Sequence, residues 1–170
     1  MNEHAHRDTL SRPVRVAIVT CSDTRTVETD SAGAALIEMS RARGWDVVGH
    51  VIVADDRQNI SAAIVSFSDA NPAADLVLTC GGTGLSPRDV TPEATRDVAP
   101  RDVPGIAENI RRESMAITRG RAQLSRAVAA QRGQTLIVNL PGSEKAVRES
   151  FGLFVDQITH AVEMAAGGGH

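Results

Sequence analysis

The stretch Thr79-Cys80-Gly81-Gly82-Thr83-Gly84-Leu85-Ser86-Pro87-Arg88-Asp89-Val90-Thr91-Pro92-Glu93 decides how this chain folds. It follows the apolar run 75–78, which is short enough for a buried strand. It ends in a predicted helix start, with Thr91 as the N-cap residue and Pro92 at the first helical position. The glycines therefore lie between the carboxyl end of a strand and the amino end of a helix, where open α/β sheets bind ligands.

The composition of this loop predicts a phosphate site. Gly81, Gly82 and Gly84 carry no Cβ, so their backbone N–H groups can close around an anion. An aspartate there would repel a bare phosphate, so Asp89 is predicted to hold a metal ion that in turn holds the phosphate. The loop is neither a P-loop nor a G-x-G-x-x-G motif. A Gly-Gly-x-Gly alone is more often a tight turn, and the specificity lies in the full run.

Size and composition exclude several classes of protein. The 170 residues suit one domain with a sizeable core. Aromatic residues make up only 2%, so the core is aliphatic and an aromatic platform for a base or pterin is nearly excluded. The net charge of −3 argues against a nucleic-acid partner. We expect no membrane span, and we interpret Cys21 and Cys80 as reduced residues of a cytoplasmic protein.

The periodicity predicts a three-layer α/β/α fold with a mostly parallel central sheet. Strands are expected over 14–20, 45–53 and 75–78, alternating with helices, and a small β-hairpin around Arg132-Gly133 extends the sheet. Later helices are predicted to begin at Pro104, with Arg111 facing away from the apolar stripe, and at Ser143, the latter running on through Val162. The expected boundaries are a disordered N-terminal tail (1–12), one domain (13–165) and a flexible C-terminal tail (166–170).

Polar loops leave four of the predicted strands. They contain Ser22-Asp23, Asp55-Asp56, the glycine loop and 139–143. Because parallel strands place these loops at one edge, carboxylates and a phosphate cradle can converge there. This favours metal-assisted nucleotide chemistry, with Mg²⁺ as the ion. Ordinary interpretations stay open for most of these residues: Asp55 and Asp56 as helix caps, Asp23 as a turn cap, and the basic run 118–126 as a solvated surface.

Six landmarks together resemble the MogA/MoaB family of molybdenum-cofactor biosynthesis proteins, which includes the gephyrin G domain. They are the glycine-loop run and 20–23, 30–33, 53–56, 124–126 and 139–142, and the resemblance spans 14–165. Two positions depart from the family pattern. Ala54 stands where relatives often have Pro, and Ala32 where they often have Ser, which leaves the shape of the Asp55 loop less defined.

The resemblance implies adenylylation of molybdopterin, in which the pterin's phosphate attacks the α-phosphate of Mg-ATP and pyrophosphate leaves. It implies that Asp55 and Asp89 are catalytic and hold Mg²⁺. By the same resemblance, ATP is contacted by Ser22, Gly81, Gly82, Thr83, Gly84, Pro141 and Gly142, and molybdopterin by Ser114, Ser125 and Asn139. The basic segment 119–126 would attract the pterin's phosphate.

The resemblance also implies small-molecule substrates, a homo-oligomer (trimer or hexamer) and other enzymes of the molybdenum-cofactor pathway as partners. A different class of function stays open. The chain could be a non-catalytic binder or scaffold, as in the MoaB branch, where the reaction of some members is unsettled. A pterin dehydratase would want a histidine cluster, which the sequence lacks. The choice between molybdenum and tungsten is also left open.

Overall fold

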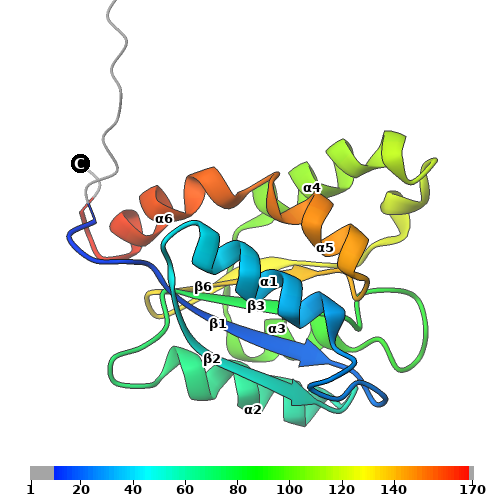
Figure 1. Ribbon diagram of the computed structural model, residues 1–170, viewed down its shortest axis with the longest axis horizontal. Helices are drawn as coiled ribbons and strands as arrows, with labels where there is room; N and C mark the ends of the chain where they lie inside the picture. Colours follow the sequence, from blue (N-terminus) through cyan, green and yellow to red (C-terminus); the bar gives the residue numbers. More distant parts are fainter. Residues whose placement is uncertain (1–9, 169–170) are drawn as a thin grey trace, which may run out of the picture.

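The computed structural model describes residues 10–168, which form a six-stranded sheet covered by helices on both faces (Figure 1). The strand order is β2-β1-β3-β6-β5-β4. The first four of these strands are parallel, and β5 runs antiparallel to both of its neighbours. The strands are β1 (Arg15–Cys21), β2 (Asp46–Val53), β3 (Leu76–Cys80), β4 (Arg101–Asp102), β5 (Ala129–Arg132) and β6 (Thr135–Leu140).

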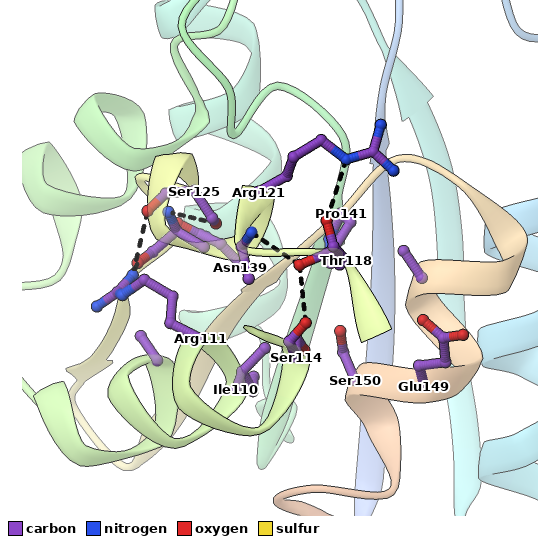
Figure 2. A pocket seen from close by; sticks show the side chains of 14 residues that line it. Ile110, Arg111, Ser114, Thr118, Arg121, Ser125, Asn139, Pro141, Glu149 and Ser150 are labelled. Carbon is purple, nitrogen blue, oxygen red and sulfur yellow. Dashed lines mark hydrogen bonds between the residues drawn. The ribbon is translucent and has the colours of Figure 1, made fainter. Parts of the chain in front are cut away.

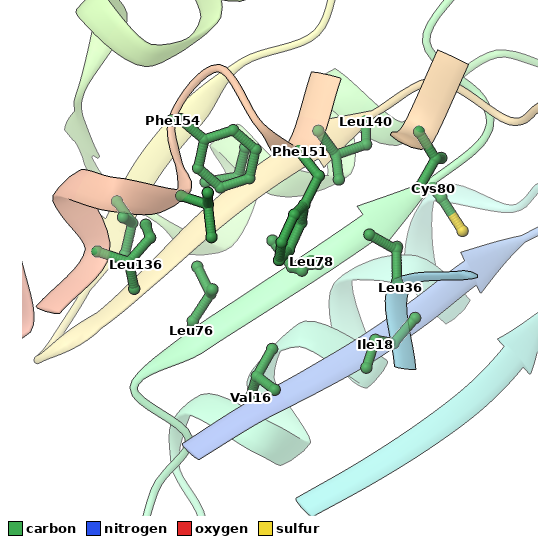
Figure 3. Packing of buried hydrophobic residues seen from close by; sticks show 14 of the residues in the cluster. Val16, Ile18, Leu36, Leu76, Leu78, Cys80, Leu136, Leu140, Phe151 and Phe154 are labelled. Carbon is green, nitrogen blue, oxygen red and sulfur yellow. The ribbon is translucent and has the colours of Figure 1, made fainter. Parts of the chain in front are cut away.

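Two apolar clusters, one on each face of the sheet, hold the layers together. Successive residues of a strand point to opposite faces, so Val16 and Ile18 enter one cluster while Ala17 and Val19 enter the other. The first cluster is shown in Figure 3, and its helices are α1 (Ser31–Ala42), α4 (Pro104–Ile117), α5 (Glu144–Phe151) and α6 (Ile158–Ala165). The second packs beneath α2 (Arg57–Ser68) and α3 (Thr91–Val98). The three-layer fold and the β5–β6 hairpin are confirmed.

The sheet changes its winding direction between β1 and β3. From β1 the chain passes through α1 to β2 at one edge, and then crosses through α2 to β3 on the other side of β1. Loops that leave the carboxyl ends of strands at such a switch point form the crevice in which α/β proteins bind ligands. The residues after Cys21 and the glycine loop after Cys80 lie at this point.

Two predicted helix boundaries were wrong. Thr91 does not cap α3; it is the first helical residue, and its hydroxyl instead donates to the carbonyl of Gly81 at 2.9 Å. The helix predicted from Ser143 to Val162 is interrupted after Phe151, and a 3₁₀ turn (Val155–Gln157) separates α5 from α6. The apolar stripe through the break is still buried, because the turn keeps Phe154 and Ile158 against the sheet.

The ordered domain extends slightly beyond both predicted boundaries. Leu10 packs against the first cluster, and Arg12 makes a two-pronged ion pair with Asp75 at 2.6 and 2.8 Å. At the other end Gly167, with φ of +87°, closes α6 through backbone hydrogen bonds. The rest of the predicted tails, 1–9 and 169–170, lies outside the described residues. Within 10–168, no helix is both long and apolar enough to cross a membrane.

Candidate functional site

The glycine loop is fixed by contacts that only glycine permits. Gly81 has φ of +100°, and a Cβ atom there would lie 2.3 Å from the carbonyl oxygen of Cys21. Gly82 has φ of +65°, and its Cβ would lie 2.4 Å from Thr91 Oγ1. Both conformations are strained for any residue with a side chain. The loop is further held because Gly81 N–H donates to Leu140 and Thr91 N–H donates to Gly82.

The loops after β1 and β2 lock onto each other through a reciprocal pair of hydrogen bonds. The Asp55 N–H donates to Asp23 Oδ1 at 3.0 Å, and the Asp23 N–H donates to Asp55 Oδ2 at 3.1 Å. Arg88, from the glycine loop, forms an ion pair with Asp23. The hydrogen bonds from Arg88, and then the one from the Asp55 backbone, lower the pKa of Asp23. These three loops therefore behave as one polar unit at the sheet edge.

Asp55 and Asp89 both face the glycine turn. A Cβ atom on Gly82 would lie 3.4 Å from Asp55 Oδ1, and one on Gly84 would lie 2.8 Å from Asp89 Oδ2. Asp89 Oδ2 also accepts from the Ser86 N–H at 3.0 Å. The two acids, 34 positions apart in sequence, thus sit against neighbouring glycines of one turn.

One oxygen of Asp55 lacks a partner. Its Oδ1 is buried and accepts no hydrogen bond from any described residue. Burial, followed by repulsion from Asp23 and Asp89, raises the pKa of Asp55. The adjacent Asp56 is the residue that caps α2, accepting from the Asn59 N–H at 2.9 Å. The capping interpretation therefore holds for Asp56, and Asp55 is left facing the turn with an unused acceptor.

These carboxylates fit a magnesium ion that is shared with phosphate oxygens. Mg²⁺ is usually held by one or two carboxylates plus substrate phosphates. Over residues 10–168 there is no cluster of three or more His, Cys, Asp or Glu side chains able to hold a metal alone. An orphaned carboxylate oxygen with a raised pKa is the environment that a cation would relieve. The donor set suits a metal that arrives with a nucleotide.

Arg126 also clamps the glycine loop, a role that sequence reasoning missed. Its guanidinium donates to the carbonyls of Gly84 and Asp89 and forms an ion pair with Glu93. Its backbone N–H donates to Thr83 at 2.9 Å. The prediction of a solvated basic run is thus wrong for Arg126. The run 124–126 is one of the landmarks of the family resemblance, but the sequence does not indicate that Arg126 binds the carbonyls of Gly84 and Asp89.

A cavity of about 260 Å³ adjoins this edge, between α4, the turn 121–124 and β6 (Figure 2). The predicted pterin-side residues Ser114, Ser125 and Asn139 all line it. Pro141 lines it as well, and the next residue, Gly142, lies so close to the glycine loop that its Cβ would be 3.2 Å from Gly81 Cα. The cavity and the glycine loop are therefore neighbours across the end of β6.

Arg111 also lines this cavity, which corrects the expectation that it faces away. Its Nη1 donates to the carbonyl of Ala127 at 2.8 Å. The apolar stripe predicted for α4 fails at its end, because Ile117 is 53% exposed. The last turn of α4 therefore extends beyond the apolar core.

Two predicted contact residues are occupied by internal hydrogen bonds. The side chain of Asn139 is buried; its amide donates to Thr79 and Thr95, and its oxygen accepts from Val128 N–H. The hydroxyl of Ser22 accepts from the N–H groups of Thr24 and Arg25. Both residues hold their own surroundings in place, and their contacts with a ligand stay predictions.

The two cysteines have no part in this chemistry. Cys21 and Cys80 end neighbouring strands but enter different apolar clusters, on opposite faces of the sheet. Burial raises the pKa of each thiol to about 12. Both are therefore unreactive core residues.

Comparison with known proteins finds a matching family and close relatives of the whole domain. The family described as "Probable molybdopterin binding domain" matches residues 17–160. Molybdenum cofactor biosynthesis protein B of Bacillus cereus is 38% identical over 149 residues, covering 87% of this chain and 88% of that protein.

Two solved structures extend the comparison. The molybdopterin biosynthesis enzyme MoaB of Thermus thermophilus superposes with a TM-score of 0.82 at 40% identity, covering 92% of this chain and 98% of that one. The molybdopterin biosynthesis Mog protein of Mycobacterium ulcerans gives a TM-score of 0.82 at 37% identity, covering 92% and 99%. This chain therefore belongs to the molybdopterin-binding domain family of molybdenum-cofactor biosynthesis proteins.

Proposed function

We propose that this protein adenylylates molybdopterin, using Mg-ATP and releasing pyrophosphate. The observation that carries the proposal is the pair Asp55 and Asp89 on one glycine turn, with an unused, buried oxygen on Asp55. An acidic pair beside an anion cradle is unfavourable unless a cation joins it. The neighbouring cavity, lined by serine and threonine, aliphatic residues and the charged residues Arg111, Arg121 and Glu149, supplies room for the second substrate.

In this proposal the two substrates meet at the end of β6. The Gly81 N–H is used by Leu140, so the backbone N–H groups of Gly82, Thr83 and Gly84 bind the phosphates of ATP. The pterin occupies the cavity that holds Ser114 and Ser125. A phosphate oxygen of molybdopterin forms a bond to the α-phosphorus of ATP, and the bond from that phosphorus to the bridging oxygen of pyrophosphate breaks. The attacking oxygen already carries negative charge, so no general base is required. The chain's main contribution is to align two anions.

Magnesium bound by Asp55 and Asp89 would screen the repulsion between those anions. Asp23 and Arg88 hold the Asp55 loop against the glycine loop. Arg126 fixes the carbonyls of Gly84 and Asp89, and so sets where the Asp89 carboxylate points. These residues act through geometry and do not need to exchange protons.

The test is pyrophosphate release when the protein is mixed with Mg-ATP and molybdopterin. We expect turnover by the wild type and a loss of about 10²–10³-fold in Asp89→Asn, the range seen when one electrostatic stabiliser of a transition state is removed. Asp56→Asn is the matched control, because asparagine caps a helix as well as aspartate does. Equal turnover by wild type and Asp89→Asn would overturn the role of Asp89.

The same mixture separates an enzyme from a binder. Calorimetry that shows tight pterin binding, without nucleotide binding or pyrophosphate, would identify a non-catalytic member of the family. The assembly into trimers or hexamers is also a proposal, which light scattering would contradict by reporting a stable monomer.

A further inference from the structure

A second cavity, of about 420 Å³, lies beside the first and shares Ala107, Arg111, Ser125 and Ala127 with it. Three arginines line this second cavity: Arg96, Arg111 and Arg126. Among the four residues that line both cavities, Arg111 is the one that carries a charge.

The positive charge in the second cavity is only partly compensated. Arg126 is paired with Glu93, but Arg96 and Arg111 have no carboxylate within 4 Å among residues 10–168. Asp102, an exposed residue, is the one carboxylate that lines the cavity. The charge of Arg96 helps to lower the pKa of Glu93, so Arg96 and Arg126 share that carboxylate. Three cations therefore face two acids, and neither Arg96 nor Arg111 has a carboxylate in direct contact among the described residues.

Arg111 is held in position without being neutralised. It is half-buried on α4, and its Nη1 donates to the backbone carbonyls of Ala127 at 2.8 Å and Ser125 at 3.4 Å. Carbonyl oxygens orient a guanidinium but carry no net charge. By contrast, Arg132 reaches a carbonyl and also forms a two-pronged pair with Asp69. A partly desolvated cation of this kind is stabilised when an anion binds beside it.

We propose that the second cavity binds a phosphate group through Arg96 and Arg111, at a site separate from the glycine loop. Guanidinium groups match the oxygens of phosphate with paired hydrogen bonds. Besides Asp102 and Ser125, the rest of the wall is apolar, with Pro104, Ala107 and Val128 among its residues, and this part suits the organic portion of a phosphate monoester. This inference does not rest on the proposed function, because it involves neither Asp55 nor Asp89.

The test follows the side-chain Nε–H signals of ¹⁵N-labelled arginine while inorganic phosphate, and separately phenyl phosphate, is added to the full-length protein. We expect the Arg96 and Arg111 signals to shift together along one saturable curve. Phenyl phosphate should bind more tightly than inorganic phosphate, since its ring can cover the apolar wall. Equal affinities would mean that the site takes free phosphate and would remove the monoester from the proposal.

Variants give the second arm of the experiment. Arg96→Gln removes an exposed side chain and should weaken phosphate binding at Arg111 about tenfold, the usual effect of losing one charge-assisted hydrogen bond. Arg111→Lys keeps the charge but loses the paired geometry, and should weaken binding as well. Arg41→Gln, an exposed arginine on α1, is the matched control for net charge and should bind like the wild type.

Three results would overturn the proposal. One is the absence of a saturable shift at Arg96 and Arg111. Another is an equal loss of binding in Arg41→Gln, which would indicate general screening. The third is a shift confined to Arg88, which would place the phosphate at the glycine loop. None of these depends on turnover, so the phosphate site and the adenylylation proposal can fail separately.

Discussion

Asp30 and Asp55 both lie near the carboxyl ends of the parallel strands, but their carboxylates differ in how many hydrogen bonds they make. Both oxygens of Asp30 are used: Oδ1 accepts from the Gly33 N–H at 2.9 Å, and Oδ2 contacts Thr20 Oγ1 at 2.6 Å and His50 Nε2 at 3.0 Å. Asp55 uses Oδ2 and leaves Oδ1 buried without a partner.

This difference separates an aspartate that builds the fold from one that awaits a ligand. A buried polar group costs stability when it is unpaired, so a native chain usually completes such bonds. The Asp30 cluster is complete, and it fixes the start of α1 against β1 and β2. The Asp55 site is incomplete, which is expected where binding supplies the missing contact.

The largest expected loss of stability comes from removing Asp30, which would disrupt the complete cluster. Asp30→Ala removes the cap of α1 and the carboxylate that Thr20 and His50 both contact, so we expect a loss of about 2–4 kcal/mol in the free energy of unfolding. Asp30→Asn keeps the cap and should lose less. Urea unfolding measures both variants. If Asp30→Ala unfolded like the wild type, the cluster would have no structural role.

Removing the clamp on the glycine loop should have an intermediate effect. Arg126→Gln loses the hydrogen bonds to Gly84 and Asp89 and leaves Glu93 unpaired. We expect a loss of about 1–2 kcal/mol in unfolding free energy. Arg148→Gln breaks exposed pairs with Glu38 and Glu144 and serves as the control, changing stability by about 0.5 kcal/mol or less. Equal losses in the two variants would show that Arg126 is an ordinary surface ion pair.

The smallest expected effect is a gain in stability, on replacing Asp55. Because burial and repulsion raise the pKa of Asp55 in the folded state, the ionised carboxylate opposes folding. Asp55→Asn should therefore raise the melting temperature at pH 7 by about 1–3 °C. The gain should be complete above the folded-state pKa and vanish below the unfolded value of about 3.9, where the acid is neutral in both states. A gain that grew on acidification would contradict this explanation.

The sequence predicted features whose residues are contiguous, and it failed where a residue's partner lies far away along the chain. The glycine loop and the strand before it were predicted because their signals are contiguous. Asp55 and Asp56 could not be told apart, since which of them caps α2 depends on where the helix begins, at Arg57. Thr91 was misassigned because its hydroxyl bonds to Gly81, ten residues earlier. Arg111 and Arg126 were missed because their acceptors lie 14 to 42 positions away.

The most direct test of the account is calorimetric titration of ATP, with and without Mg²⁺, into three proteins: wild type, Asp55→Asn and Asp56→Asn. The account predicts that wild type and Asp56→Asn bind Mg-ATP with the same Kd, and that Asp55→Asn binds at least about tenfold more weakly. It also predicts that the difference disappears when Mg²⁺ is withheld. Equal Mg-ATP affinity in all three proteins would contradict the assignment of Asp55 as the carboxylate that awaits the metal.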